Sequence, residues 1–383
     1  MADSPLTQPP LSLYIHFPWC VRKCPYCDFN SHETREIPEQ AYIRALLTDF
    51  DQDKSWWEQR SLHSIFMGGG TPSLFSASAM TQLLEALQQR IRFADNLEIT
   101  LEANPGTFEQ ARFRGYRAAG INRLSLGVQS FDDQQLQTLG RIHSSHDARH
   151  AIESALEAGF DNINIDLMHG LPQQTPAQAL SDLQQAIDLQ PTHLSWYQLT
   201  IEPNTVFYSK PPALPEDDTL WSIQEQGQQL LAEQGYQQYE ISAYSRPGKQ
   251  CQHNLNYWQF GDYLALGAGA HGKITCPDTG QIIRYQKTRL PQHYLDPEKS
   301  FTAQQAPIPP ADLPFEFFMN GFRLNQGVSK QDFEKRTGIP FRQTRAFIDK
   351  AKALGLIEET ATRCVPTDKG RLYLNDLLQL FLP

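Results

Sequence analysis

Three cysteines stand within eight residues, and their spacing limits the chemistry that this chain can carry. Cys20, Cys24 and Cys27 form a C-x3-C-x2-C pattern in a segment broken by Pro18 and Pro25. Thiolates are soft ligands that favour iron–sulfur clusters and zinc. A cubane cluster contains four irons, so three thiolates leave one iron open to a substrate or a second cofactor. The pattern therefore predicts a [4Fe–4S] cluster at a reaction site.

The cysteines could also form a zinc site or have a purely structural role. A closed zinc site takes four ligands, and His16 or His32 could supply the fourth. The cysteines could also be structural, either buried or paired in a disulfide. Six cysteines in 383 residues are too few for a disulfide scaffold. The polar, proline-broken surroundings favour a ligand loop over a core strand.

The aromatic residue Tyr26 stands directly before the last cysteine. With it, the three cysteines resemble the signature of the radical S-adenosylmethionine (SAM) superfamily. The resemblance implies that the open iron binds the amino and carboxylate groups of SAM, which the reduced cluster cleaves. In such chemistry the protein supplies positioning, electrostatics and exclusion of water. Thiols this close together also indicate a reducing compartment.

The overall charge restricts the partners. The chain has 33 basic and 43 acidic residues, a formal net charge of −10. General affinity for nucleic acid needs a basic surface, so no nucleic-acid partner is expected. Residues 1–10 have no charged start or apolar core of a secretion signal. No apolar run approaches the roughly 18 residues of a membrane span. We expect a cytoplasmic location, and peripheral membrane contact stays open.

Strand and helix patterns alternate along most of the chain. Strands are expected over residues 11–16, 64–67, 97–101, 123–127, 162–166, 193–199 and 239–241. Gly120, Gly159 and Gly235 are expected to end the helices that precede three of these strands, at the left-handed position that follows a helix. This alternation predicts parallel βαβ units of the α/β class. The pattern does not choose between a barrel and an open sheet; the resemblance implies a partial (β/α)6 TIM-type barrel.

Proline-rich sequence divides the chain near residue 290. We expect a radical SAM barrel over residues 1–290, a connection over 291–310 and a smaller C-terminal domain over 311–383. The last part predicts helices at 313–324, from Ser329, at 341–354 and at 370–380, with a hairpin near 356–365. Helices followed by a hairpin indicate a mainly helical, winged-helix-like domain. Its basic helix could dock a partner or form a solvated face, and the acidic chain favours the latter; the basic residues are Arg342, Arg345, Lys350 and Lys352.

Polar residues follow the expected strands, where parallel barrels place their active sites. The run 68–71 allows main chain to approach a ligand closely, although it could also be only a tight turn. Glu102 could accept hydrogen bonds from a ribose or simply pair with a base. Arg141 could hold a carboxylate with two parallel bonds. The resemblance implies a set of SAM contacts: Tyr14, Tyr26, Gly69, Gly70, Thr71, Glu102, Gln129, Arg141 and Asp166.

A second motif, His253-Asn254-Leu255-Asn256-Tyr257-Trp258, lies far from the cysteines. It resembles the H-N-x-x-Y-W box of heme chaperones of the HemW branch, within the anaerobic coproporphyrinogen III oxidase-like family. Neutral imidazole is a common ligand of heme iron, and the two aromatic residues could pack on the macrocycle. The resemblance implies His253 as the heme ligand. Cys251 and His271 are competing ligands, and His253 could instead only form hydrogen bonds.

These observations predict a heme chaperone that binds a [4Fe–4S] cluster, SAM and one heme and passes the heme to an acceptor protein of unknown identity. The main alternative is an oxygen-independent coproporphyrinogen III dehydrogenase. That enzyme carries a fourth cysteine where this chain has Phe29, so the activity is in doubt and no catalytic residue is assigned. A nucleic-acid-modifying radical SAM protein is the third interpretation. A dinucleotide site at 267–272 (G-x-G-x-x-G) is rejected, because neither a helix nor an acidic residue follows at the required distance.

Overall fold

One long sheet organises the molecule. The computed structural model describes residues 6–34, 36–106 and 112–382. Six parallel strands form the centre of the sheet, in the order β1 (Leu11–Phe17), β4 (Ser61–Gly69), β5 (Arg92–Ala103), β6 (Arg123–Gln129), β7 (Ile163–His169) and β8 (His193–Gln198). The edges of the whole sheet, β14 and β9, are not joined to each other. The parallel centre and the open edges confirm the partial (β/α)6 barrel.

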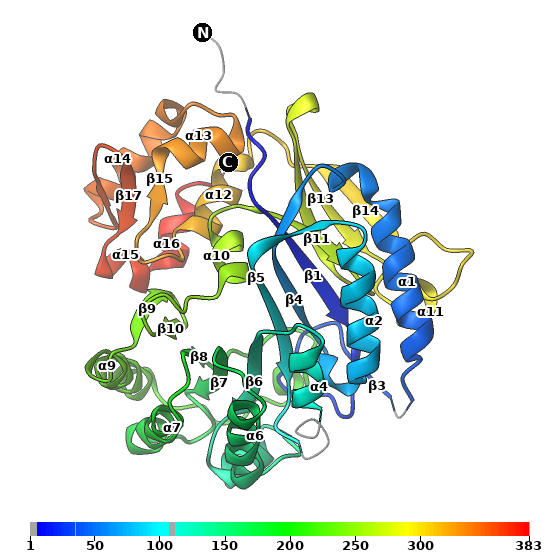
Figure 1. The fold of residues 1–383 in the computed structure, drawn as a ribbon. Helices are drawn as coiled ribbons and strands as arrows, with labels where there is room; N and C mark the ends of the chain where they lie inside the picture. The colour runs from blue at the N-terminus through cyan, green and yellow to red at the C-terminus, as the bar shows by residue number, and fades with distance from the viewer. Residues whose placement is uncertain (1–5, 35, 107–111, 383) are drawn as a thin grey trace.

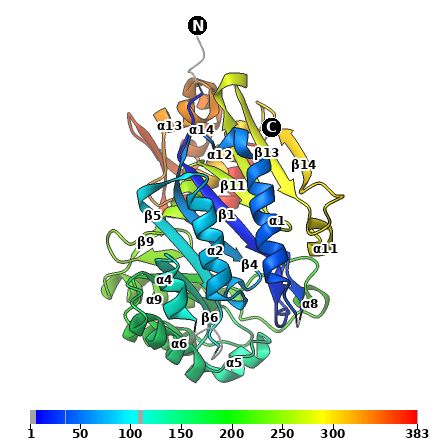
Figure 2. The same cartoon turned by 45° about the vertical axis from the view of Figure 1, so that its right-hand side comes forward.

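Helices follow the parallel strands and cover the outer face of the sheet (Figures 1 and 2). They include α1 (Glu39–Gln52), α2 (Ala77–Gln88), α4 (Phe113–Ala118), α5 (Asp133–Thr138), α6 (Ser145–Glu157) and α7 (Pro176–Asp188). Ser144 and Thr175 begin α6 and α7 with capping boxes, which satisfy free N–H groups of the first turn. Gly120 and Gly159 have φ values of +101° and +87°, as expected for residues that end helices. Among the described residues, no helix is long and apolar enough to cross a membrane.

The third helix–glycine–strand unit departs from the expected pattern. Helix α9 (Asp217–Glu233) ends before Gly235, whose φ is +77°, and β9 (Gln237–Glu240) follows. However, β10 (Ala243–Ser245) lies between β8 and β9 and runs antiparallel to both. The connection from β9 to β10 is too short for a parallel crossover, which needs a dozen or more residues. The strands of this unit therefore form an antiparallel edge of the sheet and do not extend the parallel barrel.

The other edge of the sheet contains the segment that was expected to be a connection. Strand β11 (Asp262–Leu266) pairs parallel to β1, and β12 (His271–Cys276), β13 (Gln281–Lys287) and β14 (Thr302–Pro307) continue antiparallel. Residues 291–310, which were expected to form a proline-rich connection, thus hold helix α11 (Pro291–Tyr294) and the edge strand β14. Pro291 begins the helix and Pro307 ends an edge strand, positions that tolerate proline. The domain division at residue 290 stays a prediction.

The C-terminal part packs beside α10 (Gln252–Trp258), at the upper left of Figure 1. Helices α12 (Leu313–Gly321), α13 (Lys330–Thr337) and α14 (Arg345–Ala353) surround a small sheet in the order β15 (Val328–Ser329), β17 (Arg363–Pro366), β16 (Ile357–Glu359). Helices with an antiparallel hairpin confirm the winged-helix-like prediction. The expected helix 341–354 begins as a 3-10 turn over Phe341–Thr344, and the last helix is split into α15 (Asp368–Leu372) and α16 (Leu374–Gln379).

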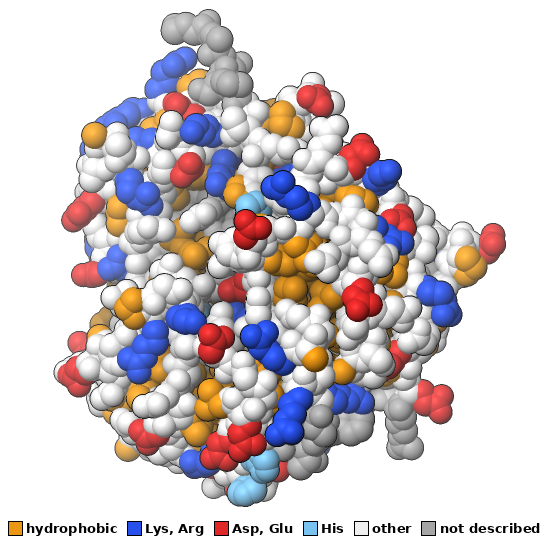
Figure 3. All heavy atoms as spheres, in the orientation of Figure 1, with side chains coloured by type: hydrophobic (Ala, Val, Ile, Leu, Met, Phe, Trp, Pro, Cys, Tyr) orange, Lys and Arg blue, Asp and Glu red, His pale blue; other side chains and the backbone are white. Residues whose placement is uncertain are grey.

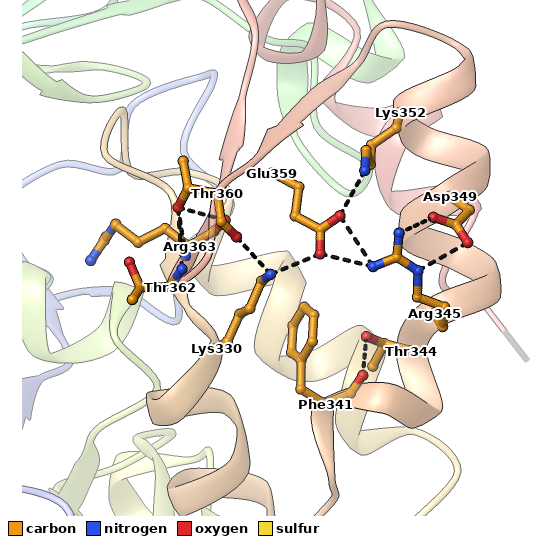
Figure 4. A network of polar contacts seen from close by, with 10 residues as sticks. All are labelled: Lys330, Phe341, Thr344, Arg345, Asp349, Lys352, Glu359, Thr360, Thr362 and Arg363. Atoms are coloured by element: carbon orange, nitrogen blue, oxygen red, sulfur yellow. Dashed lines mark hydrogen bonds and ion pairs between the residues drawn. The ribbon is translucent and has the colours of Figure 1, made fainter.

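An ion-pair network fastens the wing hairpin to the helices (Figure 4). The carboxylate of Glu359 accepts hydrogen bonds from Lys330 Nζ at 2.8 Å, Arg345 Nη1 at 3.0 Å and Lys352 Nζ at 2.7 Å. Bonds from Lys330 and then Lys352 lower the pKa of Glu359 to about 2. Arg345 also pairs with Asp349. Two of the four basic residues considered for docking are therefore engaged within the domain, and side chains of both signs cover its visible face (Figure 3).

Replacing Glu359 by glutamine should destabilise the protein at neutral pH. Because the pKa of Glu359 is depressed in the folded state, its stabilisation is present above the unfolded pKa and is lost as the pH falls from about 4.3 towards about 2. We expect Glu359→Gln to lower the free energy of unfolding at pH 7 by about 1 kcal/mol, measured by urea titration with circular dichroism. Glu358→Gln, at an exposed neighbour, is the control; an equal loss in both variants contradicts the network's role.

Candidate cluster and cofactor site

The three cysteines lie on a loop over the carboxyl ends of the parallel strands. Cys20 ends β2 (Trp19–Cys20), which pairs with β3 (His32–Glu33), and the loop between these strands carries the other two cysteines. The Cys27 N–H donates to the Cys24 carbonyl at 3.1 Å, which forms a tight turn. All three thiols are free and half-buried. The loop thus presents three thiols without a disulfide, as the cluster prediction requires.

Glycines at the end of β4 hold this loop in place. The Gly70 N–H donates to the Phe17 carbonyl at 2.7 Å, and the Thr71 N–H donates to the Trp19 carbonyl at 2.8 Å. A Cβ atom on Gly70 would lie 2.6 Å from the Trp19 carbonyl oxygen, too close for any side chain. Gly69 has a φ of +107°, which favours glycine. The glycine run therefore allows two main-chain segments to approach each other closely. It would allow a ligand to approach the main chain in the same way.

The donor set distinguishes a cluster from a single zinc ion. Among the described residues, no three His, Cys, Asp or Glu side chains are grouped so that they could hold one metal ion. A zinc site needs its ligands to converge on one point. In a cubane each thiolate binds a different iron, so the sulfurs need not converge. The ring nitrogens of His16 lie 2.9 Å from the Tyr14 hydroxyl and 2.8 Å from the Asn30 carbonyl. His16 is therefore engaged within the protein, and the three thiols fit a [4Fe–4S] cluster, which needs no fourth protein ligand.

Two donors are directed at the sulfurs. The Thr71 hydroxyl lies 3.6 Å from Cys20 Sγ, and Arg141 Nη1 lies 3.5 Å from Cys24 Sγ. Burial raises the pKa of the Cys20 and Cys27 thiols in the metal-free protein. Donors to ligand sulfurs offset the negative charge of a thiolate-bound cluster and tune its potential. The surroundings of the loop thus suit a cluster that carries net negative charge.

A cavity of about 330 Å³ opens beside the thiols. Its lining brings together nearly all of the residues that were assigned to SAM from the sequence, from strands β4 to β7, the cysteine loop and the segment after α5. The assigned residues in its lining are the three cysteines with Tyr26, Gly69, Gly70, Thr71, Glu102, Gln129, Arg141 and Asp166. Their convergence from distant parts of the chain supports a single binding site at the strand ends.

Two buried carboxyl groups dominate the electrostatics of this cavity. Burial, and then repulsion from Asp166, raises the pKa of Glu102 to about 8. Burial likewise raises the pKa of Asp166, although hydrogen bonds from Asn164 at 2.8 Å and Ser125 at 3.0 Å oppose the shift. The Gly69 N–H donates to Glu102 Oε2 at 3.0 Å. Strongly shifted carboxyl groups in a cavity are typical of binding sites.

The charges of the cavity complement SAM. SAM carries an ammonium group, a sulfonium group and a carboxylate. The two carboxyl groups can balance its cationic parts, and the Arg141 guanidinium can pair with its carboxylate. Arg141 is held in place by Asn104 Oδ1 at 2.6 Å and by the Gly127 carbonyl at 2.7 Å. The residues present therefore fit SAM as well as the cluster.

Seven polar residues that were not assigned from the sequence also line this cavity: Arg22, Lys23, Ser31, Asn104, Ser125, Ser195 and Tyr197. Asn104 links Arg141 to the Thr71 hydroxyl, to which its Nδ2 donates at 3.0 Å. Tyr197 donates its hydroxyl to Gln129 Oε1 at 2.8 Å, and Gln129 has the unusual φ of +71°. Ser125, Ser195 and Tyr197 stand within expected strands, and Asn104 stands three residues after one, so a search limited to strand ends missed them.

A second cavity, of about 700 Å³, lies on another side of the cysteine loop. Tyr14, assigned to SAM from the sequence, lines this cavity and is absent from the lining of the first. Tyr257 and Trp258 of the H-N-x-x-Y-W box lie in its wall, together with His271. Phe29, which occupies the position of the fourth cysteine, lines both cavities. The cysteine loop thus forms part of the wall of both cavities.

His253 is not in the lining of either cavity. Its side chain is 1 % exposed, on the first turn of α10. Its ring nitrogens lie 2.9 Å from the Ser64 hydroxyl and 2.9 Å from the Tyr257 hydroxyl. Burial lowers its pKa to about 3, so the imidazole is neutral. Cys251 is also buried, and its thiol donates to Glu98 at 3.5 Å. Both nitrogens of His253 are therefore engaged in this conformation.

Residues 267–270 of the glycine-rich run form a turn between β11 and β12, and residues 271 and 272 begin β12. A strand thus stands where a dinucleotide site needs a helix. A Cβ atom on Gly267 would lie 2.2 Å from the His16 carbonyl, and one on Gly269 would lie 2.3 Å from Asn30 Nδ2. The turn therefore packs closely against the start and the end of the cysteine loop.

A partial (β/α)6 barrel with a three-cysteine loop and a charged cavity at its strand ends defines a radical SAM protein. The family model for the radical SAM superfamily matches residues 14–186. The model for the HemN C-terminal domain matches residues 308–373. The first match runs from β1 to α7 of the barrel, and the second covers most of the winged-helix-like part.

Relatives that match over nearly their whole length show which family of radical SAM proteins is involved. Heme chaperone HemW of Haemophilus influenzae is 57% identical over 98% of both chains. HemW of Escherichia coli is 53% identical over 98% of both chains, and HemW of Bacillus subtilis is 33% identical over 97% of this chain and 99% of its own. The chain belongs to the HemW family of the radical SAM superfamily.

A solved structure shares the fold. The coproporphyrinogen III oxidase HemN of Escherichia coli superimposes with a TM-score of 0.82 at 24% identity, over 98% of this chain and 90% of its own. The similarity covers the barrel and the C-terminal part together. At this identity it establishes the common fold and carries no statement about activity.

Replacing Glu102 by glutamine should change how the stability of the metal-free protein depends on pH. The pKa of Glu102 is raised to about 8, so its contribution to stability is full below the unfolded pKa and is lost as the pH rises from about 4.3 to about 8. We expect the free energy of unfolding of the wild type to fall relative to Glu102→Gln by up to about 1.4 kcal/mol per pH unit in this window. Urea titrations at pH 5 to 8 with a thiol reductant measure it. Glu153→Gln, at an exposed site, should follow the wild type; parallel curves for Glu102→Gln would contradict the shift.

Proposed function

We propose that this chain is a heme chaperone that holds a [4Fe–4S] cluster and SAM in the smaller cavity, binds one heme at the larger one and passes it to an acceptor protein. Its family membership and the H-N-x-x-Y-W box support the heme part. Free thiols suit a reducing compartment, so we also propose a cytoplasmic location.

The observation that carries the proposal is the wall shared by the two cavities. The thiols face the cavity of about 330 Å³, and the aromatic residues of the H-N-x-x-Y-W box face the one of about 700 Å³. Ligand cavities in proteins commonly measure 300–1,000 Å³, so each is large enough for a ligand of its own. Because Phe29 lines both, occupation of one side can affect the other through the loop.

The residues of the chain have distinct tasks in this proposal. Cys20, Cys24 and Cys27 hold the cluster, which supplies an open iron for the amino-acid part of SAM when both are bound. Arg141 pairs with the carboxylate of SAM, and the carboxyl group of Glu102 orients the ligand from the opposite side. These groups bind and orient the cofactor, and the apolar Phe29 separates it from the heme side.

The alternatives have less support. Phe29 is 61 % exposed and offers no ligand at the position where the dehydrogenase pattern has its fourth cysteine. A nucleic-acid substrate requires a basic surface, whereas the net charge is −10 and Arg345 and Lys352 are engaged in ion pairs.

The cluster assignment predicts a selective loss of iron. After anaerobic reconstitution, the wild type should contain about four irons and four sulfides per chain. Cys24→Ala should lose most of this iron, together with the visible absorption of the cluster, because only two thiolates remain. Cys276→Ala, at a free cysteine outside the loop, should retain it. Zinc in place of iron, or full iron content in Cys24→Ala, would remove the cluster from this site.

The heme assignment is tested against the dehydrogenase alternative. We expect reconstituted protein to bind about one heme per chain, with nanomolar to micromolar affinity. The heme-loaded protein should reactivate heme-dependent enzymes in extract of heme-starved cells faster than the same concentration of free heme. Coproporphyrinogen III should stay unchanged in an anaerobic assay with SAM and reductant. Decarboxylation of coproporphyrinogen III without heme binding would favour the enzyme instead.

A further inference from the structure

The larger cavity contains a histidine that the motif does not include. We infer that His271 is the side chain that binds heme iron, that Arg289 pairs with a heme propionate, and that His253 positions Tyr257 without touching the metal. The inference rests on the proposed heme-chaperone function and specifies its binding site.

The cavity has a composition suited to a flat, largely apolar ligand with an acidic edge. Aromatic side chains come from the cysteine loop, from β1, from α10 and from β11: Phe29, Tyr14, Tyr257, Trp258 and Tyr263. The rings of Tyr257 and Tyr263 meet edge to face, with centroids 4.5 Å apart. Such rings can pack on a macrocycle, and a volume of about 700 Å³ falls within the range of ligand cavities.

His271 is placed to reach such a ligand. It is the first residue of β12, its side chain is exposed, and it lines the cavity. No hydrogen bond of its ring is found among the described residues, so either nitrogen can bind a metal. Gly272 holds the strand close to its neighbour, since a Cβ atom there would lie 2.3 Å from the ring of Tyr285. His271 therefore projects from a rigid hairpin.

The surroundings also favour the neutral imidazole that binds iron. Burial, followed by the positive charges of Arg284 and Arg289, lowers the pKa of His271. Metal ligation requires an unprotonated nitrogen. The two arginines thus disfavour protonation of this ring, which lies in the cavity wall.

The ring of His253, in contrast, is buried and has hydrogen-bond partners on both nitrogens. Ligation of heme would require its 1 % exposed ring to leave both hydroxyl partners, Ser64 and Tyr257. Each partner would then be left as a buried, unsatisfied polar group, which is costly. The ring of His253 instead packs edge to face against that of Tyr257, with centroids 4.7 Å apart. This contact fixes the Tyr257 ring in the cavity wall.

Arg289 supplies the charge that the acidic edge of heme needs. It lines the same cavity and is exposed, and no carboxylate pairs with its guanidinium among the described residues. Its main-chain carbonyl accepts a hydrogen bond from Asn30 Nδ2 at 2.9 Å, which holds it beside the cysteine loop. Arginine binds carboxylates with two parallel hydrogen bonds. Asp28 also lines the cavity, so the propionate must lie on the Arg289 side.

The test is a heme titration of cluster-loaded protein, read by the Soret band and by resonance Raman spectra of the iron–ligand state. We expect His271→Ala to weaken heme binding at least tenfold and to lose the imidazole spectrum. In His271→Gly, added imidazole should restore that spectrum. His253→Gln should retain the imidazole spectrum with weaker binding, because only the position of Tyr257 changes. His63→Ala, at an exposed histidine away from the cavity, is the control.

The propionate contact is tested with heme dimethyl ester, whose acidic groups are blocked. The wild type should prefer free heme to the ester, and Arg289→Gln should lose this preference while its Soret band is unchanged. Retention of the imidazole spectrum and affinity in His271→Ala, with their loss in His253→Gln, would overturn the assignment and leave the proposed function intact. Failure of the wild type to bind heme would remove the proposed function, and this assignment with it. Circular dichroism and iron content of each variant report that it is folded.

Discussion

The end of strand β4 and the cysteine loop lie within main-chain hydrogen-bond distance, and this contact requires glycine. The Gly70 N–H reaches the Phe17 carbonyl at 2.7 Å, where a Cβ atom would collide with the Trp19 carbonyl. Gly267 approaches the His16 carbonyl, at the end of β1, in the same way. Main-chain contacts therefore fix the end of β1, from which the cysteine loop begins, and the loop lies between the two cavities.

The smaller cavity is costly to maintain when it lacks a cationic ligand. Glu102 and Asp166 are buried near each other, and burial raises the pKa of both carboxyl groups. Such groups oppose folding stability, and proteins retain them where binding needs them. A ligand that brings positive charge would relieve the repulsion and stabilise the folded state by mass action. The same carboxyl groups that weaken the empty barrel thus favour a ligand of the charge of SAM.

Two histidines near the larger cavity differ in burial and in hydrogen bonding. His253 belongs to the recognisable box, yet it is buried and satisfied by two hydroxyl groups. His271 lies outside that box, yet it lines the cavity, and its ring has no hydrogen-bond partner among the residues that the structure describes. A residue in a motif can serve by fixing its neighbour, because a binding surface needs rigid walls as well as ligands.

Local patterns were sufficient for much of the fold and for the smaller site. Strand ends with polar residues, glycines that end helices and three closely spaced cysteines depend only on neighbours in the sequence, so the parallel strands and part of the lining of the first cavity could be predicted. The placement of Tyr14, the antiparallel insertion of β10 and the edge strand β14 could not, because they depend on which distant segments pair. Likewise, the sequence determined that His253 and His271 are imidazoles that could bind iron, and only the tertiary structure decided which ring is exposed. Burial is set by the packing of segments distant in the chain, and no local pattern contains that information.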